Sequence, residues 1–232
     1  MSEAQRRHWL VRTVVGVLVA VALVVGAPWV YARFIAREAP DPLALSTPTT
    51  SAEAQIPTGR LEIDGTWSVG EGSEAGYRLG EVLSGQQTTV VGRTEGVTGA
   101  VVVNGGMLDE VTIAVDAGSI STDAGARDAY FRRALDTSSF PEARFELTEP
   151  VDISALGQAD VPLSVTAVGT MTLHGVPQPA TAALDVQRTA GGVEVAGQIQ
   201  ITLTDFGLTA PDLGWVVVEP TGAIEVRLVL GH

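Results

Sequence analysis

Segments in which apolar and polar residues alternate fill most of the chain beyond residue 65. The clearest are 161–173, 180–186, 193–203, 215–219 and 224–230, and noisier ones cover 67–69, 77–83, 88–92, 99–103 and 108–116. A period of two between Gly or Pro turns is typical of antiparallel strands with one dry and one wet face. We therefore expect an all-β fold, an antiparallel meander of about eight strands that closes into a barrel. The last two segments are expected to form a hairpin through Pro220, Thr221 and Gly222.

One segment breaks this pattern. Ser121 to Asp136 begins with Ser, Thr and Asp, which are good N-cap residues, and then places Ala126, Tyr130 and Ala134 on one helical face. The segment predicts a short helix inserted into the β-protein, where it would cover one opening of the barrel.

The pattern near the N-terminus is different again. Thr13 to Ala32 is an uncharged, Val-rich stretch of 20 residues, and a helix of that length spans about 30 Å, the hydrocarbon thickness of a bilayer. Arginines are in slight excess on its N-terminal side, which favours an N-in, C-out orientation. We expect a single transmembrane helix at 13–32 that follows a cytoplasmic tail at 1–12.

Two other interpretations of this stretch stay open. Val30 to Ala32 has spacing suited to signal-peptide cleavage, and Arg6 to Leu10 loosely resembles a twin-arginine export signal. Both the anchor and the cleaved signal place the rest of the chain outside the cytoplasm. A helix buried in a core is the third reading, and the flanking arginines disfavour it.

Residues 33–59 contain Pro40, Pro42, Pro48 and Pro57 among Ser, Thr and Ala, a composition typical of a partly extended linker. Residues 60–232 then form one domain that is large enough to bury its own core. The chain has no cysteine, which excludes disulfides and thiolate metal sites, and its net charge is −13. Such a charge argues against nucleic acid as a partner of the domain surface.

Several motifs occur in order along this domain. They are a Trp strand at Gly65–Val69, a Ser-Ile step at Ser119–Asp123 followed by Arg127-Asp128, an aromatic-Pro strand at Phe140–Leu147, a hairpin at Gly169–Val176 and a late Asp-Phe-Gly segment at Asp205–Leu208. Together they resemble the YceI-like family, the lipid- or polyisoprenoid-binding barrels of bacterial periplasms and envelopes, over about residues 60–230. The family's early His-Ser pair is absent, and Thr204 stands where the family commonly has Arg.

The resemblance implies a lipocalin-like barrel with a long apolar tunnel that holds an isoprenoid or other lipid chain. Apolar inward-facing side chains suit a hydrocarbon ligand, because they offer dispersion and burial without hydrogen bonds. The candidate lipid-binding residues are Tyr77, Leu79, Phe131, Leu135, Phe140, Phe145, Leu147, Phe206, Leu208 and Trp215. Phe131 and Leu135 are favoured because a covering helix must face the opening.

Residues with other chemistry are sparse. His174 precedes Gly175 in the hairpin motif, where a turn role is favoured, and the only other histidines are His8 and His232. Arg127-Asp128 fits a helix start, and the aspartates near it lack calcium-loop spacing. We therefore expect no catalytic residues, no metal site and no cofactor.

These observations predict a membrane-tethered, extracytoplasmic protein that sequesters or carries a polyisoprenoid or similar long-chain lipid. The alternative is a solid-core barrel that acts as an interaction or structural ectodomain, since small barrels are often filled by their own side chains. An enzyme acting on lipid is disfavoured, because no acid–base or nucleophile constellation is present. The oligomeric state stays open, a homodimer included.

Overall fold

The structure is a computed structural model that describes residues 39–47, 62–83, 85–158 and 161–232. The expected cytoplasmic tail, the expected transmembrane helix and most of the expected linker lie outside these residues. No helix among the residues described is long and apolar enough to cross a bilayer.

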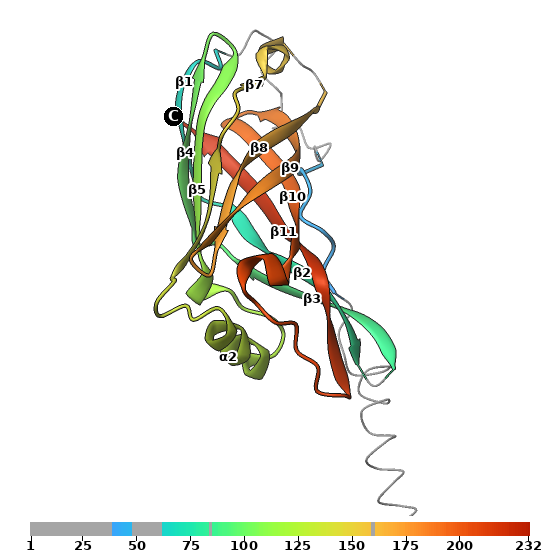
Figure 1. Cartoon of the computed structure of the whole chain (residues 1–232). Coiled ribbons are helices and arrows are strands. Elements are labelled where there is room, and N and C mark those ends of the chain that lie inside the picture. Colours follow the sequence, from blue (N-terminus) through green and yellow to red (C-terminus); the bar gives the residue numbers. More distant parts are fainter. Residues whose placement is uncertain (1–38, 48–61, 84, 159–160) are drawn as a thin grey trace, which may run out of the picture.

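Eight strands close into an antiparallel barrel (Figure 1). Around the ring, each strand pairs with the next, and β11 pairs with β1 to complete the circle. The ring consists of β1 (Gly65–Val69), β4 (Val97–Asn104), β5 (Met107–Asp116), β6 (Glu142–Leu147), β8 (Leu163–Leu173), β9 (Val176–Thr189), β10 (Gly192–Thr202) and β11 (Val216–Gly231). The all-β antiparallel barrel expected from the alternating segments is therefore confirmed.

Two further strands extend the sheet beyond the ring. β2 (Glu74–Leu83) pairs with β11 over residues 216–227, and β3 (Gln86–Thr94) pairs with β2. The far part of this hairpin and the beginning of β11 project past the end of the barrel (Figure 1). We call this projection, residues 79–83, 86–90 and 211–220, the tongue. A two-residue strand, β7 (Val151–Asp152), pairs with β5 at the opposite end.

The hairpin expected through Pro220, Thr221 and Gly222 is wrong. Residues 216–231 form one continuous strand, and its pairing with β2 shifts register between Val218 and Gly222. The Pro-Thr-Gly sequence therefore makes a β-bulge, a place where a strand tolerates proline. Gly222 is required there, because a Cβ atom would collide with the Leu79 side chain and the Arg78 carbonyl.

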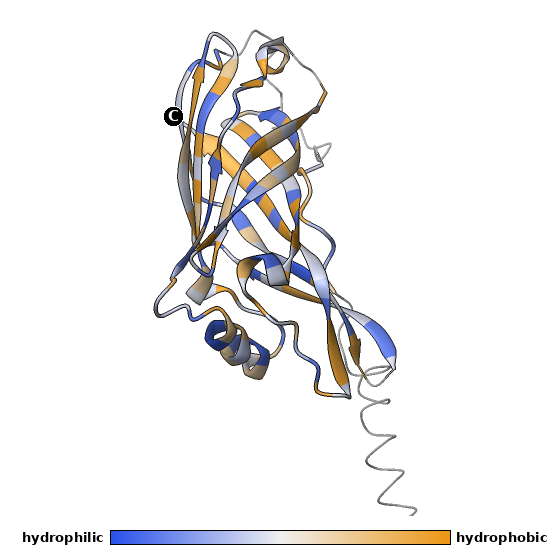
Figure 2. Cartoon of the chain, in the orientation of Figure 1, coloured by the Kyte–Doolittle hydropathy of each residue, from blue (hydrophilic) through white to orange (hydrophobic). Residues whose placement is uncertain are grey.

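Hydrophobic and hydrophilic residues alternate along the strands of the barrel (Figure 2). On β11, Ile224, Val226, Leu228 and Leu230 face inward, whereas Glu225 and Arg227 lie on the outer face. The inner face of every ring strand supplies residues to one apolar cluster. A core enclosed by the ring is what the period-two pattern predicts for a closed sheet, and a smaller cluster of Tyr77, Val90 and Ile120 lies outside it.

The inserted helix is present but shorter than expected. α2 covers Gly125–Ala134, with a one-turn 3₁₀ helix η2 (Ala117–Ser119) before it. Its N-cap residue is Ala124, which offers no side-chain cap, while Asp128 in the first turn accepts hydrogen bonds from Thr122 instead. The other 3₁₀ helices are η3 (Ser154–Gln158) and η4 (Leu203–Phe206).

Candidate functional site

An apolar cavity of about 130 Å³ lies inside the barrel. Every ring strand contributes to its lining, and the one polar residue in that lining, Gln198, is solvent-exposed. The lining residues are Ile63, Trp67, Val101, Val103, Leu108, Val111, Ile113, Val115, Ala143, Phe145, Ile153, Leu156, Val165, Ala167, Met171, Ala182, Leu184, Val186, Val193, Val195, Gln198, Ile199, Ile224, Val226, Leu228 and Leu230. Such a lining can hold a hydrocarbon but offers no hydrogen bonds to a polar group.

The interior is hollow because small side chains occupy inward positions where larger ones would fill it. Ala167 on β8 and Ala182 on β9 are directly paired, and both are buried in the lining. Ala143 on β6 is a third. Trp67 closes part of the space from β1, and its indole Nε1–H donates to the carbonyl of Ile63 at 2.9 Å. Its polar atom is thereby satisfied, so the ring presents only carbon to the cavity.

The end of the barrel beside the tongue is covered by α2 (Figure 1). The Phe131 ring of α2 stacks on the Tyr77 ring of β2, with centroids 4.7 Å apart and planes 13° apart. Arg127 of α2 lies 3.7 Å from the buried carboxylate of Glu81. Leu135, just past the helix, is buried in the core. No residue within α2 itself is buried, but Phe131 packs against the apolar core as well as on Tyr77, and Arg127 adds the ion pair.

Burial raises the pKa of the Tyr77 hydroxyl, and the nearby carboxylates of Asp128, Glu81 and Asp123 raise it further, while Arg127 opposes them. The folded protein therefore keeps this proton at a pH where the unfolded chain, with an ordinary pKa near 10, loses it. The contribution of the Tyr77 hydroxyl to the unfolding free energy is fully present below pH 10 and falls as the pH rises above 10.

We expect Tyr77→Phe to remove this loss of stability above pH 10. Between pH 9.5 and pH 11, the group should cost the wild type about 1 kcal/mol of unfolding free energy. Urea unfolding at the two pH values measures the difference, and Tyr130→Phe, at an exposed ring of α2, is the matched control. A pH slope that is equal in wild type and Tyr77→Phe would contradict the expectation.

The ten predicted lipid-binding residues fall into four places. Phe145 lines the cavity, and Tyr77, Leu79 and Phe131 pack together beneath α2. Leu135, Leu147, Phe206 and Leu208 belong to the core cluster or pack against it. Phe140 and Trp215 are exposed, and Phe140 lies edge-on to the His174 ring. Whether any of them contacts a ligand stays a prediction.

Sequence reasoning missed most of the lining, including Trp67, Met171 and the three alanines. The signal was available, since each lies at an inward position of an alternating strand. The predicted set consists of six aromatic residues and four leucines, whereas most of the lining is Val, Ile and Leu.

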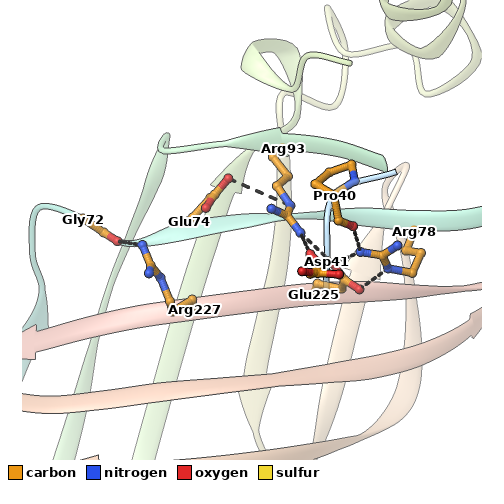
Figure 3. A network of polar contacts seen from close by, with 8 residues as sticks. All are labelled: Pro40, Asp41, Gly72, Glu74, Arg78, Arg93, Glu225 and Arg227. Atoms are coloured by element: carbon orange, nitrogen blue, oxygen red, sulfur yellow. Dashed lines mark hydrogen bonds and ion pairs between the residues drawn. The ribbon is translucent and has the colours of Figure 1, made fainter. Parts of the chain in front are cut away.

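A second site, on the outside of the barrel, was also missed (Figure 3). The carboxylate of Glu225, 2% exposed, is 2.5 Å from Arg78 Nε and 3.5 Å from Arg93 Nη2. The same guanidinium groups donate to backbone carbonyls of residues 39–47, which we call the strap: Arg78 to Pro40 at 2.7 Å, and Arg93 to Asp41. The strap is thus fixed to the barrel wall at this point.

A second contact holds the other end of the strap. The backbone N–H and the hydroxyl of Ser46 donate to Glu194 Oε2 at 3.1 and 2.6 Å, and Gln187 Nε2 donates to the Ser46 carbonyl at 3.0 Å. The expected linker therefore includes a segment that lies along β2, β11, β10 and β9, without regular secondary structure.

His174 occupies the turn between β8 and β9 with a φ of 53°, and its Nδ1 is 3.3 Å from the Phe206 carbonyl oxygen. The expected turn role is confirmed. Within the described ranges, no group of three or more His, Asp or Glu side chains is placed to hold a metal ion.

An eight-stranded antiparallel barrel with an apolar interior is either filled by its own side chains or holds one small ligand. The family model described as the YceI-like domain matches residues 70–230. This chain belongs to the YceI-like family. No curated protein matches the sequence.

Two solved structures share the fold. A polyisoprenoid-binding domain from Saccharophagus degradans, implicated in plant cell wall breakdown, is 22% identical with a TM-score of 0.58, and the match covers 71% of this chain and 97% of that domain. BcnA from Burkholderia cenocepacia is 13% identical with a TM-score of 0.51, and the match covers 67% and 96% of the two chains.

Proposed function

We propose that this protein is a membrane-tethered, extracytoplasmic barrel that holds the hydrocarbon chain of a polyisoprenoid or similar lipid and catalyses no reaction. The observation that carries the proposal is the wholly apolar cavity inside a closed barrel of the YceI-like family. The polyisoprenoid-binding description of the Saccharophagus degradans domain supports the ligand class. The apolar stretch at residues 13–32 supports the tether.

The volume of the cavity constrains how a lipid would bind. An engineered cavity of about 150 Å³ admits benzene, so 130 Å³ has room for about one isoprene unit. Pockets for larger ligands measure about 300–1,000 Å³. A long chain would therefore enter only if the interior widens.

The small volume also favours the second candidate, a barrel whose own side chains nearly fill it and which acts as an interaction ectodomain. The two candidates differ in whether lipid occupies the interior. Lipid bound there must be displaced by any side chain that fills the same space, whereas a solid barrel has no such lipid to lose.

We expect Ala182→Phe to reduce bound lipid by about tenfold or more, equivalent to at least ~1.4 kcal/mol of binding free energy. The phenyl ring would project from β9 into the cavity. Full-length protein is expressed with export, purified in one detergent and extracted with organic solvent, and the extract is quantified by mass spectrometry. Ala114→Phe is the matched control, since Ala114 lies between the inward-facing Ile113 and Val115 and so faces outward.

A stoichiometric prenyl lipid in wild type and Ala114→Phe, but not in Ala182→Phe, supports the proposal. Equal lipid in all three proteins places that lipid outside the cavity. A wild type that yields no lipid and takes up no prenyl quinone favours the interaction ectodomain.

A further inference from the structure

We propose that the tip of the tongue, residues 211–217, inserts into the surface of a lipid bilayer. This insertion would turn the α2 end of the barrel toward the membrane. This inference rests on the proposed function for the presence of a membrane tether. Its evidence is the exposed apolar tip and the path of the strap, neither of which the proposed function uses.

The tip presents large apolar side chains to solvent. Leu213 and Trp215 are 59% and 57% exposed, and Val217 next to them is also exposed. Figure 2 shows this beginning of β11 in hydrophobic colours. A soluble domain buries such residues or uses them, and a group of them at one projecting point marks a contact with a partner or a membrane.

The tip is a turn whose backbone groups are hydrogen-bonded. Leu213 N–H donates to the Val216 carbonyl at 2.8 Å, and Gly214 N–H donates to Asp212 Oδ1 at 2.9 Å. Val218 N–H donates to the Pro211 carbonyl at 2.9 Å. Because these bonds fix the turn, Leu213 and Trp215 are held outward and would lose little conformational freedom on insertion.

The strap indicates which partner the tip meets. Its first residues are bonded to Arg78 and Arg93, whereas Ser46 is bonded to Glu194. Arg78 pairs with Ala223 of β11, and Glu194 pairs with Val229. The strap therefore begins, at Ala39, on the side of the barrel nearer the tongue and runs toward the opposite end.

The lengths agree with this orientation. From Arg78 to Leu83 at the tongue's far end is five residues, about 17 Å at ~3.3 Å per residue. From Ala32, the end of the apolar stretch, to Ala39 is seven residue steps, at most about 25 Å. A membrane that holds residues 13–32 is thus within reach of the tip, while the opposite end of the barrel points away from it.

Tyr130 on α2 is exposed at the same end, with the Arg133 guanidinium 6.0 Å from its ring centroid. Trp and Tyr are enriched at membrane interfaces, where their rings lie between lipid tails and water. The chain's net charge of −13 disfavours attraction to a strongly anionic surface. The apolar tip would therefore drive contact with zwitterionic lipid.

The test uses the absence of cysteine. Full-length Leu213→Cys and Val161→Cys are each labelled with an environment-sensitive fluorophore and placed in phosphatidylcholine nanodiscs. Val161 is the matched control, since it is 70% exposed and precedes β8 at the end of the barrel away from the tongue. Iodide reports contact with water, and doxyl-labelled phosphatidylcholine reports contact with lipid tails.

We expect iodide quenching at position 213 to be several-fold lower than at 161, and doxyl quenching to occur at 213 alone. Equal iodide quenching at both positions overturns the proposal. Protection from iodide without doxyl quenching also overturns it, because a second copy or another protein would then cover the tip. Lipid extracted from the same samples reports the proposed function separately, so either proposal can fail while the other stands.

Discussion

Replacing Trp67 with alanine is expected to lower the unfolding free energy by about 4 kcal/mol, the usual range for removing a buried aromatic side chain. Trp67 is 3% exposed, lines the cavity and bonds to the Ile63 carbonyl at 2.9 Å. The substitution removes this packing, leaves that carbonyl without its donor and enlarges an existing void. Urea unfolding followed by circular dichroism measures the change.

Trp215→Ala is the matched control, because the same substitution at an exposed tip should cost no more than about 0.5 kcal/mol. A prenyl lipid that enters the cavity should also restore more stability to Trp67→Ala than to the wild type, since it fills the larger void. If the two tryptophan variants lose equal stability, the assignment of Trp67 to the core is wrong.

The strands were predictable because a barrel has one dry face, so residues such as Val111, Ile113 and Val115 must alternate with polar ones. The expected hairpin at Pro220–Gly222 failed because proline and glycine signal both turns and bulges. Only the pairing with β2, a segment more than 130 residues earlier, decides between them. Local sequence does not contain that partner.

The sequence predicted that the site is an apolar cavity inside a barrel, but it did not predict which residues line that cavity. Alternation identifies which side chains face inward, yet a cavity depends on their summed volume across all eight strands. Ala167 and Ala182 leave space only because they are paired across β8 and β9. Phe206 and Leu208, which are among the predicted lipid-binding residues, belong to the core cluster.

The strap could not be predicted, because Glu225 lies at an outward position of its strand and was expected to be solvated. Burial of that carboxylate depends on Arg78, Arg93 and the strap, all more than 130 residues away in sequence. The bonded strap also links the two proposals, because a strap fixed to the barrel wall would give the membrane tether a defined orientation.

Replacing Glu225 with alanine is expected to cost about 3 kcal/mol, because Arg78 loses its carboxylate partner and Arg93 keeps only Glu74, 4.0 Å away. We take the low end of that range, since both arginine side chains are 21% exposed and partly hydrated. Hydrogen exchange at the strap's amides, residues 41 and 43–46, should also rise, because the guanidinium groups that bond to the Pro40 and Asp41 carbonyls lose the carboxylate that holds them in place.

Glu142→Ala is the matched control. Glu142 pairs with Arg144 at 2.9 Å, but both side chains are largely solvated, so losing this pair should cost less than about 1 kcal/mol and leave exchange in the strap unchanged. Equal losses in the two variants would mean that Glu225 behaves as a surface charge. A large loss of stability with unchanged strap exchange would mean that the strap is held by Glu194 and Gln187 alone, and that Glu225 serves the barrel wall rather than the orientation of the tether.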